Sequence, residues 1–303
     1  MPLPLIDPAS YPAQLAAKVA RFKQDFAPYA LPEPEVFASA PLHYRLRVEF
    51  RIWHHGEALD YAMFDPDNPR QPVLMADFPA ASASVCALMP RLRERLLAST
   101  TLRKRLYGAE FLATLSGEML VTLIYHRKLD AEWEAAARQL ANDLGIALIG
   151  RSKGQKIVLE RDWVIESFEL NGRQLRYQQF EGSFSQPNGG VNRQMLGWAC
   201  ARVQAIGGDL LELYCGNGNF TVALAPLFGK VLATEVSKPS VQAARYNLAA
   251  NAIANTAIVR MSSEEISAAL AGRETFQRLK DVDLAAHRFT TIFVDPPRSG
   301  LDP

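Results

Sequence analysis

The feature that most constrains the fold of this chain is an apolar segment that runs directly into a glycine-rich turn. Residues 210–215 are expected to form a buried strand, and residues 220–228 are expected to form a helix that ends at Gly229. Gly216 and Gly218 allow the sharp turn between them, because a residue without a Cβ lets the backbone approach a ligand closely. This strand–turn–helix order is typical of an α/β fold with a ligand at the turn.

A second segment, residues 231–235, is expected to form a strand that ends at Glu235, 19 residues after Gly216. Doubly wound folds hold a nucleoside in this way, with the glycine turn at one end and the ribose hydroxyls on the acid. Thr221 stands where a dinucleotide-binding turn has its third glycine, so a pyrophosphate is disfavoured and an NAD-dependent dehydrogenase is a distant alternative. S-adenosyl-L-methionine, which has no pyrophosphate, is the expected cofactor.

A third strand, residues 289–294, leads into a rigid acidic loop. Asp295 is followed by two prolines, which fix an extended loop and present the carboxylate at the end of the strand. In open α/β sheets the ligand crevice lies beyond the carboxyl ends of the strands. Methyltransferases that act on amino groups tend to have an aromatic residue after Pro-Pro, whereas this chain has Arg298, which makes exocyclic nitrogen chemistry less favoured.

Three polar residues are weaker candidates for cofactor contacts. Tyr214 and Asn219 flank the glycine turn, where a ring and an amide could touch the cofactor. Gln186 lies just before Pro187 and the first helix of the α/β half, where it could orient a cofactor or substrate group. Each residue is individually as well explained by packing, by a helix cap or by a helix-entry turn.

The composition predicts about two domains and places few further limits on function. The chain has 303 residues, of which 49% are apolar, and its net charge is +1, so any nucleic-acid affinity must come from local patches. No apolar run reaches the ~18 residues of a membrane span, and the N-terminus does not resemble a signal peptide. The three cysteines have neither a disulfide nor a metal-ligand spacing. A cytoplasmic monomer without a membrane or metal partner is expected.

The periodicity changes along the chain and divides it near residue 182. Residues 1–182 are expected to be α+β with antiparallel pairs, and residues 183–303 to alternate strand and helix around a parallel sheet. The elements expected in the first part are helices over 11–26, 80–98 and 130–144, strands over 44–53 and 60–64, and hairpins over 110–125 and 146–159. In the second part they are helices over 191–206 and 239–252, a capped helix from 262, and a strand over 257–261.

Arginines and aromatic residues of the first part suggest contact with RNA. In residues 44–53 apolar side chains alternate with Arg45, Arg47 and Arg51, so the arginines are expected on the open face of a half-buried strand. Four more basic clusters follow, with Trp53, Tyr107 and Tyr125 near them in sequence: 91–95, 103–105, 126–128 and 151–156. Arginine for phosphate and exposed rings for unstacked bases is a combination found in RNA-binding proteins. Any single cluster is more often a solvated face.

Four segments together resemble the bacterial tRNA (uracil-5-)-methyltransferase family: residues 43–53, 184–188, 210–220 and 295–302. The resemblance runs from about Tyr11 to the end and implies an α+β RNA-binding domain followed by a Rossmann-like, S-adenosylmethionine-dependent methyltransferase sheet. It implies the T-arm of tRNA as substrate, with methylation of the T-loop uridine at position 54, and transfer-messenger RNA (tmRNA) as a second substrate. The positions that match the family's cofactor contacts are Gln186, Tyr214, Asn219, Glu235 and Asp295. The positions that match its RNA contacts are Arg51, Tyr107 and His126, with Tyr107 a mild departure from the family's aromatic residue there.

The chemistry of this family needs residues that the chain lacks. A thiolate must add to carbon 6 of uracil before carbon 5 can attack the methyl group, and a base must then remove the carbon-5 proton. The family's nucleophilic cysteine lies in a Ser-Cys-Asn-Pro stretch and its base glutamate near the C-terminus, and neither stretch occurs here. None of Cys86, Cys200 and Cys215 matches the position of the nucleophile. We therefore expect a C-terminally truncated chain, without the sheet's last strands, that binds but does not turn over.

Two alternatives remain open at this point. The chain could methylate an amino group of guanine or adenine, which needs no cysteine, or it could be a non-catalytic RNA-binding module with a vestigial cofactor fold. The modified nucleoside would identify the first alternative. Loss of cofactor binding with intact RNA binding would identify the second.

Overall fold

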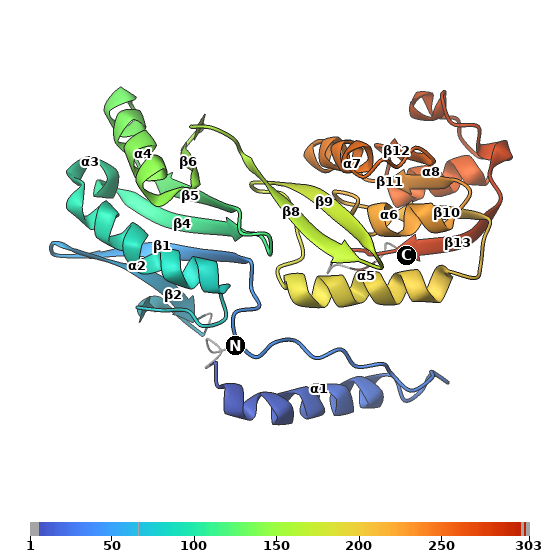
Figure 1. Ribbon diagram of the computed structural model, residues 1–303, viewed down its shortest axis with the longest axis horizontal. Coiled ribbons are helices and arrows are strands. Elements are labelled where there is room, and N and C mark those ends of the chain that lie inside the picture. Colours follow the sequence, from blue (N-terminus) through green and yellow to red (C-terminus); the bar gives the residue numbers. More distant parts are fainter. Residues whose placement is uncertain (1–5, 66, 298–299, 301–303) are drawn as a thin grey trace. The chain divides into compact units, whose positions relative to one another are not determined.

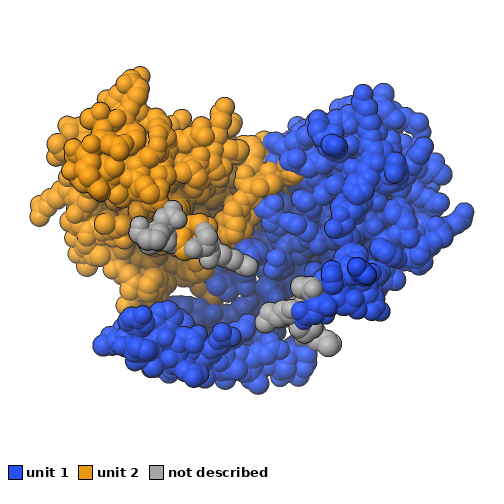
Figure 2. Space-filling view, turned by 180° about the vertical axis from the view of Figure 1, so that it is seen from behind, with its two compact units in different colours: residues 1–162, 187–192 blue, residues 163–186, 193–303 orange. Residues whose placement is uncertain are grey.

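The computed structural model describes residues 6–65, 67–297 and 300, which form two compact units. The first unit comprises Met1–Asp162 with Pro187–Asn192, and the second comprises Trp163–Gln186 with Arg193–Pro303 (Figure 2). Residues 163–182 therefore group with the second unit by their contacts, although the expected domain boundary lies after residue 182. The domain boundary after residue 182 therefore remains a prediction.

The first unit contains a seven-stranded sheet in the order β3-β2-β1-β4-β5-β6-β7 (Figure 1). Neighbouring strands are antiparallel except for β5 and β6, which are parallel. The elements of this unit are, in chain order, η1 (Pro8–Ser10), α1 (Tyr11–Asp25), β1 (Arg47–His55), β2 (Ala58–Asp65), β3 (Asn68–Met75), α2 (Ala83–Ala98), α3 (Thr100–Arg103), β4 (Leu106–Ala113), β5 (Met119–Tyr125), α4 (Ala131–Leu144), β6 (Ala147–Ser152) and β7 (Gln155–Val158).

One face of this sheet is covered by α2 and α4, and the apolar alternation of β1 follows from that cover. Val48, Phe50 and Ile52 are buried in the core, whereas Arg51 and Trp53 point to the opposite, open face. The helices pack their own apolar faces into the same core, as Figure 1 shows for α2 and α4 beside the strands. The predicted half-buried strand is confirmed with Arg47 and Arg51 on its outer face, whereas Arg45, which was expected on the same strand, precedes it.

Close packing between α4 and β6 fixes the far part of the core. Trp133 of α4 is fully buried, and a Cβ placed on Gly150 of β6 would lie 2.2 Å from its ring. The N-cap of the helix is Asp130, whose side chain accepts a hydrogen bond from the backbone of Trp133, and the C-cap is Gly145, with a φ of 66°. Position 150 requires glycine because a Cβ would clash with the Trp133 ring. Position 145 favours glycine because its φ is positive.

The second unit contains a four-stranded parallel sheet and a separate β8–β9 hairpin. Its elements are β8 (Trp163–Leu170), β9 (Arg173–Phe180), α5 (Gly189–Val203, which begins in the first unit), β10 (Asp209–Leu213), α6 (Asn219–Leu224), η2 (Ala225–Leu227), β11 (Val231–Thr234), α7 (Lys238–Ala250), β12 (Thr256–Val259), α8 (Ser263–Leu270), η3 (Gln277–Leu279), η4 (Leu284–Ala286) and β13 (Phe289–Val294).

Helices cover both faces of the parallel sheet, so the second unit is doubly wound, as predicted. α5, α6 and α7 pack on one face together with β8 and β9, and α8 and η3 pack on the other. The strand order is β12-β11-β10-β13. β11 and β12 follow β10 on one side and β13 lies on its other side, so the order of the strands changes between β10 and β13. In such sheets the ligand crevice lies outside the carboxyl ends of the strands at this reversal. The glycine turn after β10 and Asp295 after β13 stand on its two sides.

Within the described ranges, no helix combines the length and the apolar character that crossing a bilayer requires. The same residues contain no group of three His, Cys, Asp or Glu side chains placed to hold a metal ion.

Candidate functional site

The turn between β10 and α6 exposes backbone where a ligand can approach. Tyr214, Gly216 and Gly218 all have left-handed conformations, with φ values of 58°, 56° and 79°. The turn is closed by the backbone of Gly218, which donates to the carbonyl of Cys215 at 2.8 Å. A Cβ on Gly216 would meet nothing within 4 Å, whereas one on Gly218 would lie 3.4 Å from Ala244 of α7. The space beside Gly216 is therefore open, and Gly218 allows α7 to pack closely.

The carboxylate of Glu235 braces this turn. Its Oε2 accepts a hydrogen bond from the backbone of Gly216 at 3.0 Å, and its Oε1 accepts one from the backbone of Ser237 at 2.7 Å. Each carboxylate oxygen can accept more than one hydrogen bond, so Glu235 keeps acceptor capacity for the hydroxyls of a ribose. The structure brings the end of β11 to the turn after β10, as the spacing of these residues in the sequence predicts.

Tyr214 is held in its strained conformation by a contact on the far side of the sheet. Its hydroxyl lies 2.5 Å from that of Ser263, the first residue of α8. A non-glycine residue at a positive φ costs of order 1–3 kcal/mol, and such residues cluster at ligand sites. The hydrogen bond to Ser263 fixes where the Tyr214 ring stands beside the turn.

Asn247, which was not predicted from the sequence, stabilises the turn by hydrogen bonds. This fully buried residue of α7 donates to the carbonyl of Asn217 at 2.8 Å and accepts from the backbone of Gln178 at 2.6 Å. The signal in the sequence was an amide on the apolar face of the helix predicted over 239–252. Asn219, the first residue of α6, is half-buried, and its carbonyl accepts from the hydroxyl of Tyr177 at 3.1 Å.

Two carboxyl groups flank the reversal between β10 and β13. Glu212 of β10 is only 1% exposed, and this burial raises its pKa to about 8; the neighbouring Thr221 opposes the shift, and the charge of Asp295 adds a smaller rise. Glu212 Oε2 has no hydrogen-bond partner among the described residues. Asp295 is exposed, yet partial desolvation of its carboxyl raises its pKa as well. Both shifts reflect desolvation of a carboxyl group near the point where the strand order changes.

The other sequence candidates for this site are less defined. Gln186 is half-buried between β9 and α5, and its side chain makes no hydrogen bond to a described residue. Arg298, which argued against amino-group chemistry, lies outside the described residues. Gln186, Tyr214, Asn219, Glu235 and Asp295 all belong to the second unit, and their role in cofactor binding stays a prediction.

None of the three cysteines is placed to act as a thiolate. Cys215 is 4% exposed, and burial beside Glu212 and Glu235 raises its pKa well above the usual range. Burial also raises the pKa of Cys200. Cys86 is half-buried, its thiol donates to the carbonyls of Phe78 and Ala81, and desolvation raises its pKa. A nucleophilic cysteine needs the opposite environment, which lowers the thiol pKa.

In the first unit, the structure brings together the three residues predicted to contact RNA. The rings of Tyr107 and His126 are stacked, with centroids 3.9 Å apart and planes inclined by 28°. The guanidinium of Arg51 lies over the ring of Tyr107, 4.0 Å from its centroid. The polar atoms of these three side chains have no hydrogen-bond or ion-pair partner in the described part of the chain. They are free to bind a ligand.

A β-bulge explains how Tyr107 reaches Arg51. Leu106 pairs with Tyr125 and Gly108 pairs with Ile124, so Tyr107 is the extra residue in β4. A bulge of this kind re-aims side chains, and here it leaves both Tyr107 and Gly108 on the open face. Gly108 lies directly opposite Arg51 in the β1–β4 register and, having no side chain, leaves the open face clear.

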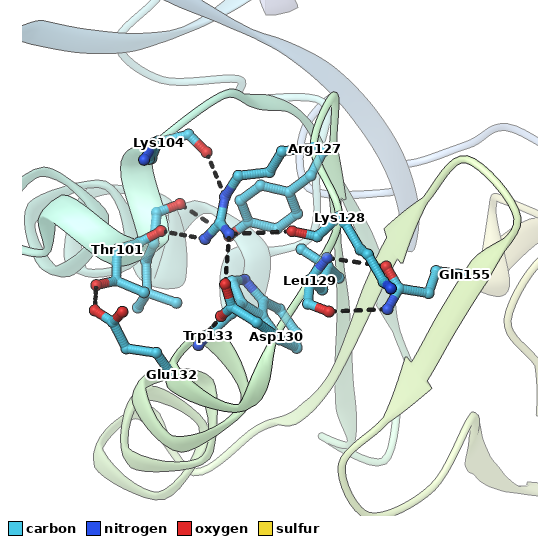
Figure 3. Close-up of polar contacts among 11 residues, drawn as sticks. Thr101, Lys104, Arg127, Lys128, Leu129, Asp130, Glu132, Trp133 and Gln155 are labelled. Atoms are coloured by element: carbon cyan, nitrogen blue, oxygen red, sulfur yellow. Dashed lines mark hydrogen bonds and ion pairs between the residues drawn. The ribbon is translucent and has the colours of Figure 1, made fainter.

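The segment that carries His126 is fixed by its neighbour Arg127 (Figure 3). The Arg127 guanidinium donates to the carbonyls of Thr101, Lys104 and Lys128 at 2.8, 3.0 and 3.2 Å. It also forms an ion pair with Asp130 at 3.6 Å. The stack on Tyr107 is therefore supported from behind by Arg127, which sequence reasoning treated only as one charge of a basic cluster.

Other arginines and lysines of the predicted clusters are engaged within the first unit. Arg93 pairs with Asp60 at 2.6 Å, Arg95 with Asp143 at 3.7 Å, and Lys156 with Asp162 at 2.7 Å. These three contribute to the structure rather than to a free basic surface, as expected for most charge clusters.

Comparison with known proteins identifies a family for almost the whole chain. The profile described as tRNA (uracil-5-)-methyltransferase matches residues 10–303. Two relatives that carry the name tRNA/tmRNA (uracil-C(5))-methyltransferase, from Dechloromonas aromatica and Aromatoleum aromaticum, are each 70% identical over 302 residues. These matches cover 100% of this chain and 83% and 82% of the two relatives. A relative of the same name from Pseudomonas entomophila is 51% identical over 299 residues, which are 99% of this chain and 83% of that relative.

A solved structure shares the fold. It is the crystal structure of a Pyrococcus abyssi tRNA (uracil-54, C5)-methyltransferase in complex with S-adenosyl-L-homocysteine. The superposition has a TM-score of 0.68 at 17% sequence identity and covers 97% of this chain and 69% of that one. The predicted combination of an α+β part with a Rossmann-like methyltransferase sheet is confirmed.

Proposed function

Because the chain belongs to the tRNA (uracil-5-)-methyltransferase family, we propose that its two units provide the cofactor site and the RNA site for methylation of uracil at carbon 5. S-adenosyl-L-methionine supplies the methyl group when bound. The glycine turn and Glu235 of the second unit hold the adenosine, and the open sheet face of the first unit holds the RNA. Family membership removes the support for amino-group methylation and for an NAD-dependent dehydrogenase.

The proposed target is uridine 54 in the T-loop of tRNA, and the corresponding uridine of tmRNA. Relatives that are 70% identical to this chain are named for both RNAs, and the Pyrococcus abyssi enzyme is described as acting on uracil 54. A uridine in a folded loop must leave its stack before carbon 5 can be reached. The half-buried ring of Tyr107 and the exposed ring of His126, beside the unpaired Arg51, are suited to stabilise such an unstacked strand.

The observation that carries the cofactor proposal is the contact of Glu235 with the backbone of Gly216. It places a carboxylate at the edge of a turn whose open side has room for a ligand. In the proposal Glu235 receives the ribose hydroxyls, Tyr214 and Asn219 line the turn, and Asp295 and Gln186 complete the site.

Isothermal calorimetry with S-adenosyl-L-methionine and S-adenosyl-L-homocysteine tests the cofactor site. Both ligands are expected to bind the full chain, whereas NAD is not. Glu235→Gln keeps the size of the side chain but removes one acceptor, so at least about a tenfold weaker binding is expected. Glu169→Gln, an exposed change on β8 of the same unit, is the matched control. Equal affinities of the two variants, or no heat with either ligand, would refute the assignment.

For the reaction itself, we propose that none of Cys86, Cys200 and Cys215 is the nucleophile, because burial raises the pKa of all three thiols. The 303-residue chain is then expected to bind cofactor and tRNA without forming 5-methyluridine. Mass spectrometry of nucleosides from an unmodified tRNA transcript incubated with this chain is the measurement. Formation of 5-methyluridine would overturn the proposal, and a methylated amino group would overturn the assignment of the reaction.

A further inference from the structure

On the open face of the first unit, the three predicted RNA contacts are part of a longer row of side chains. Arg51 lies not only over Tyr107 but also 5.9 Å from the centroid of Phe64. Phe64 in turn contacts Trp53, with centroids 6.2 Å apart and planes at 65°. The row therefore runs His126, Tyr107, Arg51, Phe64, Trp53, with a cation between two aromatic pairs.

The strand register produces this row. Arg51 and Trp53 are two residues apart on β1 and so share a face, and they pair with Ala62 and Asp60 of β2. Phe64 follows two residues after Ala62 on the same face of β2. The small side chain of Ala62, like Gly108 on the other side, leaves room for the Arg51 guanidinium to reach a ring.

The charged neighbours of Arg51 leave its guanidinium free. Glu49 pairs with Arg47, and Asp60 pairs with Arg93 and His55. Arg51 forms no ion pair with a described residue, so its donors are oriented by two rings and available to an external anion. A cation held in this way suits the phosphate of a nucleic acid strand.

Trp53 at the end of the row has the features of a binding residue rather than of a packing residue. Its side chain is 38% exposed, and its indole N–H has no hydrogen-bond partner among the described residues. A tryptophan that serves packing alone would usually be buried and would bond that group. The exposed ring offers a face to a base and a donor to its edge.

We propose that Trp53, supported by Phe64, is a second base-stacking site, so that the open face of the first unit binds at least two unstacked nucleotides of an RNA strand. One base stacks at the His126–Tyr107 end and the other at the Trp53–Phe64 end, with Arg51 on the phosphate between them. This inference rests on the proposed function, which supplies RNA as the ligand, and it extends the RNA site beyond the positions of Arg51, Tyr107 and His126.

Titration of the full chain with an unmodified tRNA transcript at fixed salt tests the inference. Trp53→Ala is expected to weaken binding about 5- to 150-fold, the loss for one base–ring stack, and Trp53→Phe is expected to restore most of it. Trp198→Ala is the matched control, because Trp198 is 42% exposed and also contacts an arginine, Arg202, but belongs to the second unit. Equal effects of the two alanine variants would overturn the inference.

The salt dependence separates stacking from charge. Arg51→Ala is expected to reduce the slope of log affinity against log salt by about 0.7, since one phosphate contact is lost, whereas Trp53→Ala leaves the slope unchanged. A reduced slope in Trp53→Ala would mean that the whole face has been disturbed and would contradict a stacking role.

Tryptophan fluorescence gives a direct readout. The emission of Trp53, obtained by subtracting the spectrum of the Trp53→Phe variant, should be quenched when tRNA saturates the chain. Unchanged Trp53 emission with tRNA bound would overturn the second stacking site and leave the proposed function intact. Absence of any tRNA binding by the unaltered chain, with S-adenosyl-L-methionine still bound, would overturn both the RNA part of the proposed function and this inference.

Discussion

The buried carboxyl of Glu212 should make the stability of this protein depend on pH in a predictable direction. Glu212 lies in the middle strand pair of the parallel sheet, between Ala233 of β11 and Phe293 of β13, and its Oε2 has no hydrogen-bond partner among the described residues. An unpaired carboxylate in such a place is costly, so the folded state keeps the proton. Glu212→Gln replaces the protonated acid by a neutral group of the same size.

The size of the effect follows from the pKa. Folding raises the pKa of Glu212 from 4.5 to about 8. Between these values the native state retains the proton while the unfolded state has released it, so the free energy of unfolding falls by about 1.4 kcal/mol per pH unit as the pH rises. The stability contributed by the protonated form is present below pH 4.5 and is lost as the pH rises through 8. The total loss is about 5 kcal/mol.

Equilibrium denaturation between pH 5 and pH 9 measures this effect. The original chain should lose stability steeply over this range, and Glu212→Gln should lose much less, so that the variant becomes the more stable protein at alkaline pH. In Glu212→Gln, the raised pKa of Asp295 should still make the free energy of unfolding fall slightly as the pH rises. Glu169→Gln serves again as the exposed control and should follow the original chain. Parallel profiles of the original chain and Glu212→Gln would refute the reasoning.

Three further changes test the packing and chemistry described above. In denaturant titrations, Arg127→Met should lower the free energy of unfolding by about 1–3 kcal/mol, because it removes the charged hydrogen bonds behind His126, whereas the same change at the exposed Lys128 should not. Arg127→Met should also weaken tRNA binding. Gly150→Ala should lower the unfolding free energy by about 1–3 kcal/mol through overpacking against the neighbouring tryptophan ring, and Gly190→Ala, where the added Cβ has ordinary contacts, should not. All the cysteines should react with iodoacetamide at pH 7.5 more slowly than glutathione does; fast labelling of any of them in a mass spectrum would contradict the raised thiol pKa values.

The parts of the fold that were predicted from the sequence are those set by local signals. Ser262 and Glu265 form the predicted capping box with both hydrogen bonds present, and α8 begins there. The predicted helix over 130–144 is observed as α4, ending at Gly145. The strand, glycine turn and strand over 210–235 form the parallel pair β10 and β11, because apolar runs bounded by glycine and acid have few other stable arrangements.

Three strands were missed for two different reasons. β3 contains Pro69 and Pro72 and is largely exposed, so it has neither a strand propensity nor an apolar face, and it forms only as the edge partner of β2. The hairpin of β8 and β9 had a usable signal. Asn171 and Gly172, with φ values of 51° and 75°, form the two-residue turn that Asn-Gly favours between strands.

The residues proposed to bind the cofactor were selected from the sequence, but the contacts among them could not be. Glycine spacing and a strand-end acid identified Gly216 and Glu235, yet the hydrogen bond between them depends on how two parallel strands align. The roles of Asn247 and Glu212 were not predicted, because the function of a polar residue in an apolar segment depends on which residues surround it in the folded protein. Their burial is a tertiary property, which no local pattern encodes.

The open face of the first unit, where RNA contact is proposed, shows most clearly what the sequence alone cannot predict. Counting arginines suggested five basic clusters, but the capacity of an arginine to bind phosphate depends on which carboxylates lie beside it, and strand register decides that. Arg93 is paired because α2 places it against Asp60, whereas Arg51 is free because it lies opposite Ala62 and Gly108. The bulge at Tyr107 then places a ring under the free guanidinium. A one-residue shift of β1 against β4 would keep the composition and destroy the surface, since it would turn Arg51 toward the core.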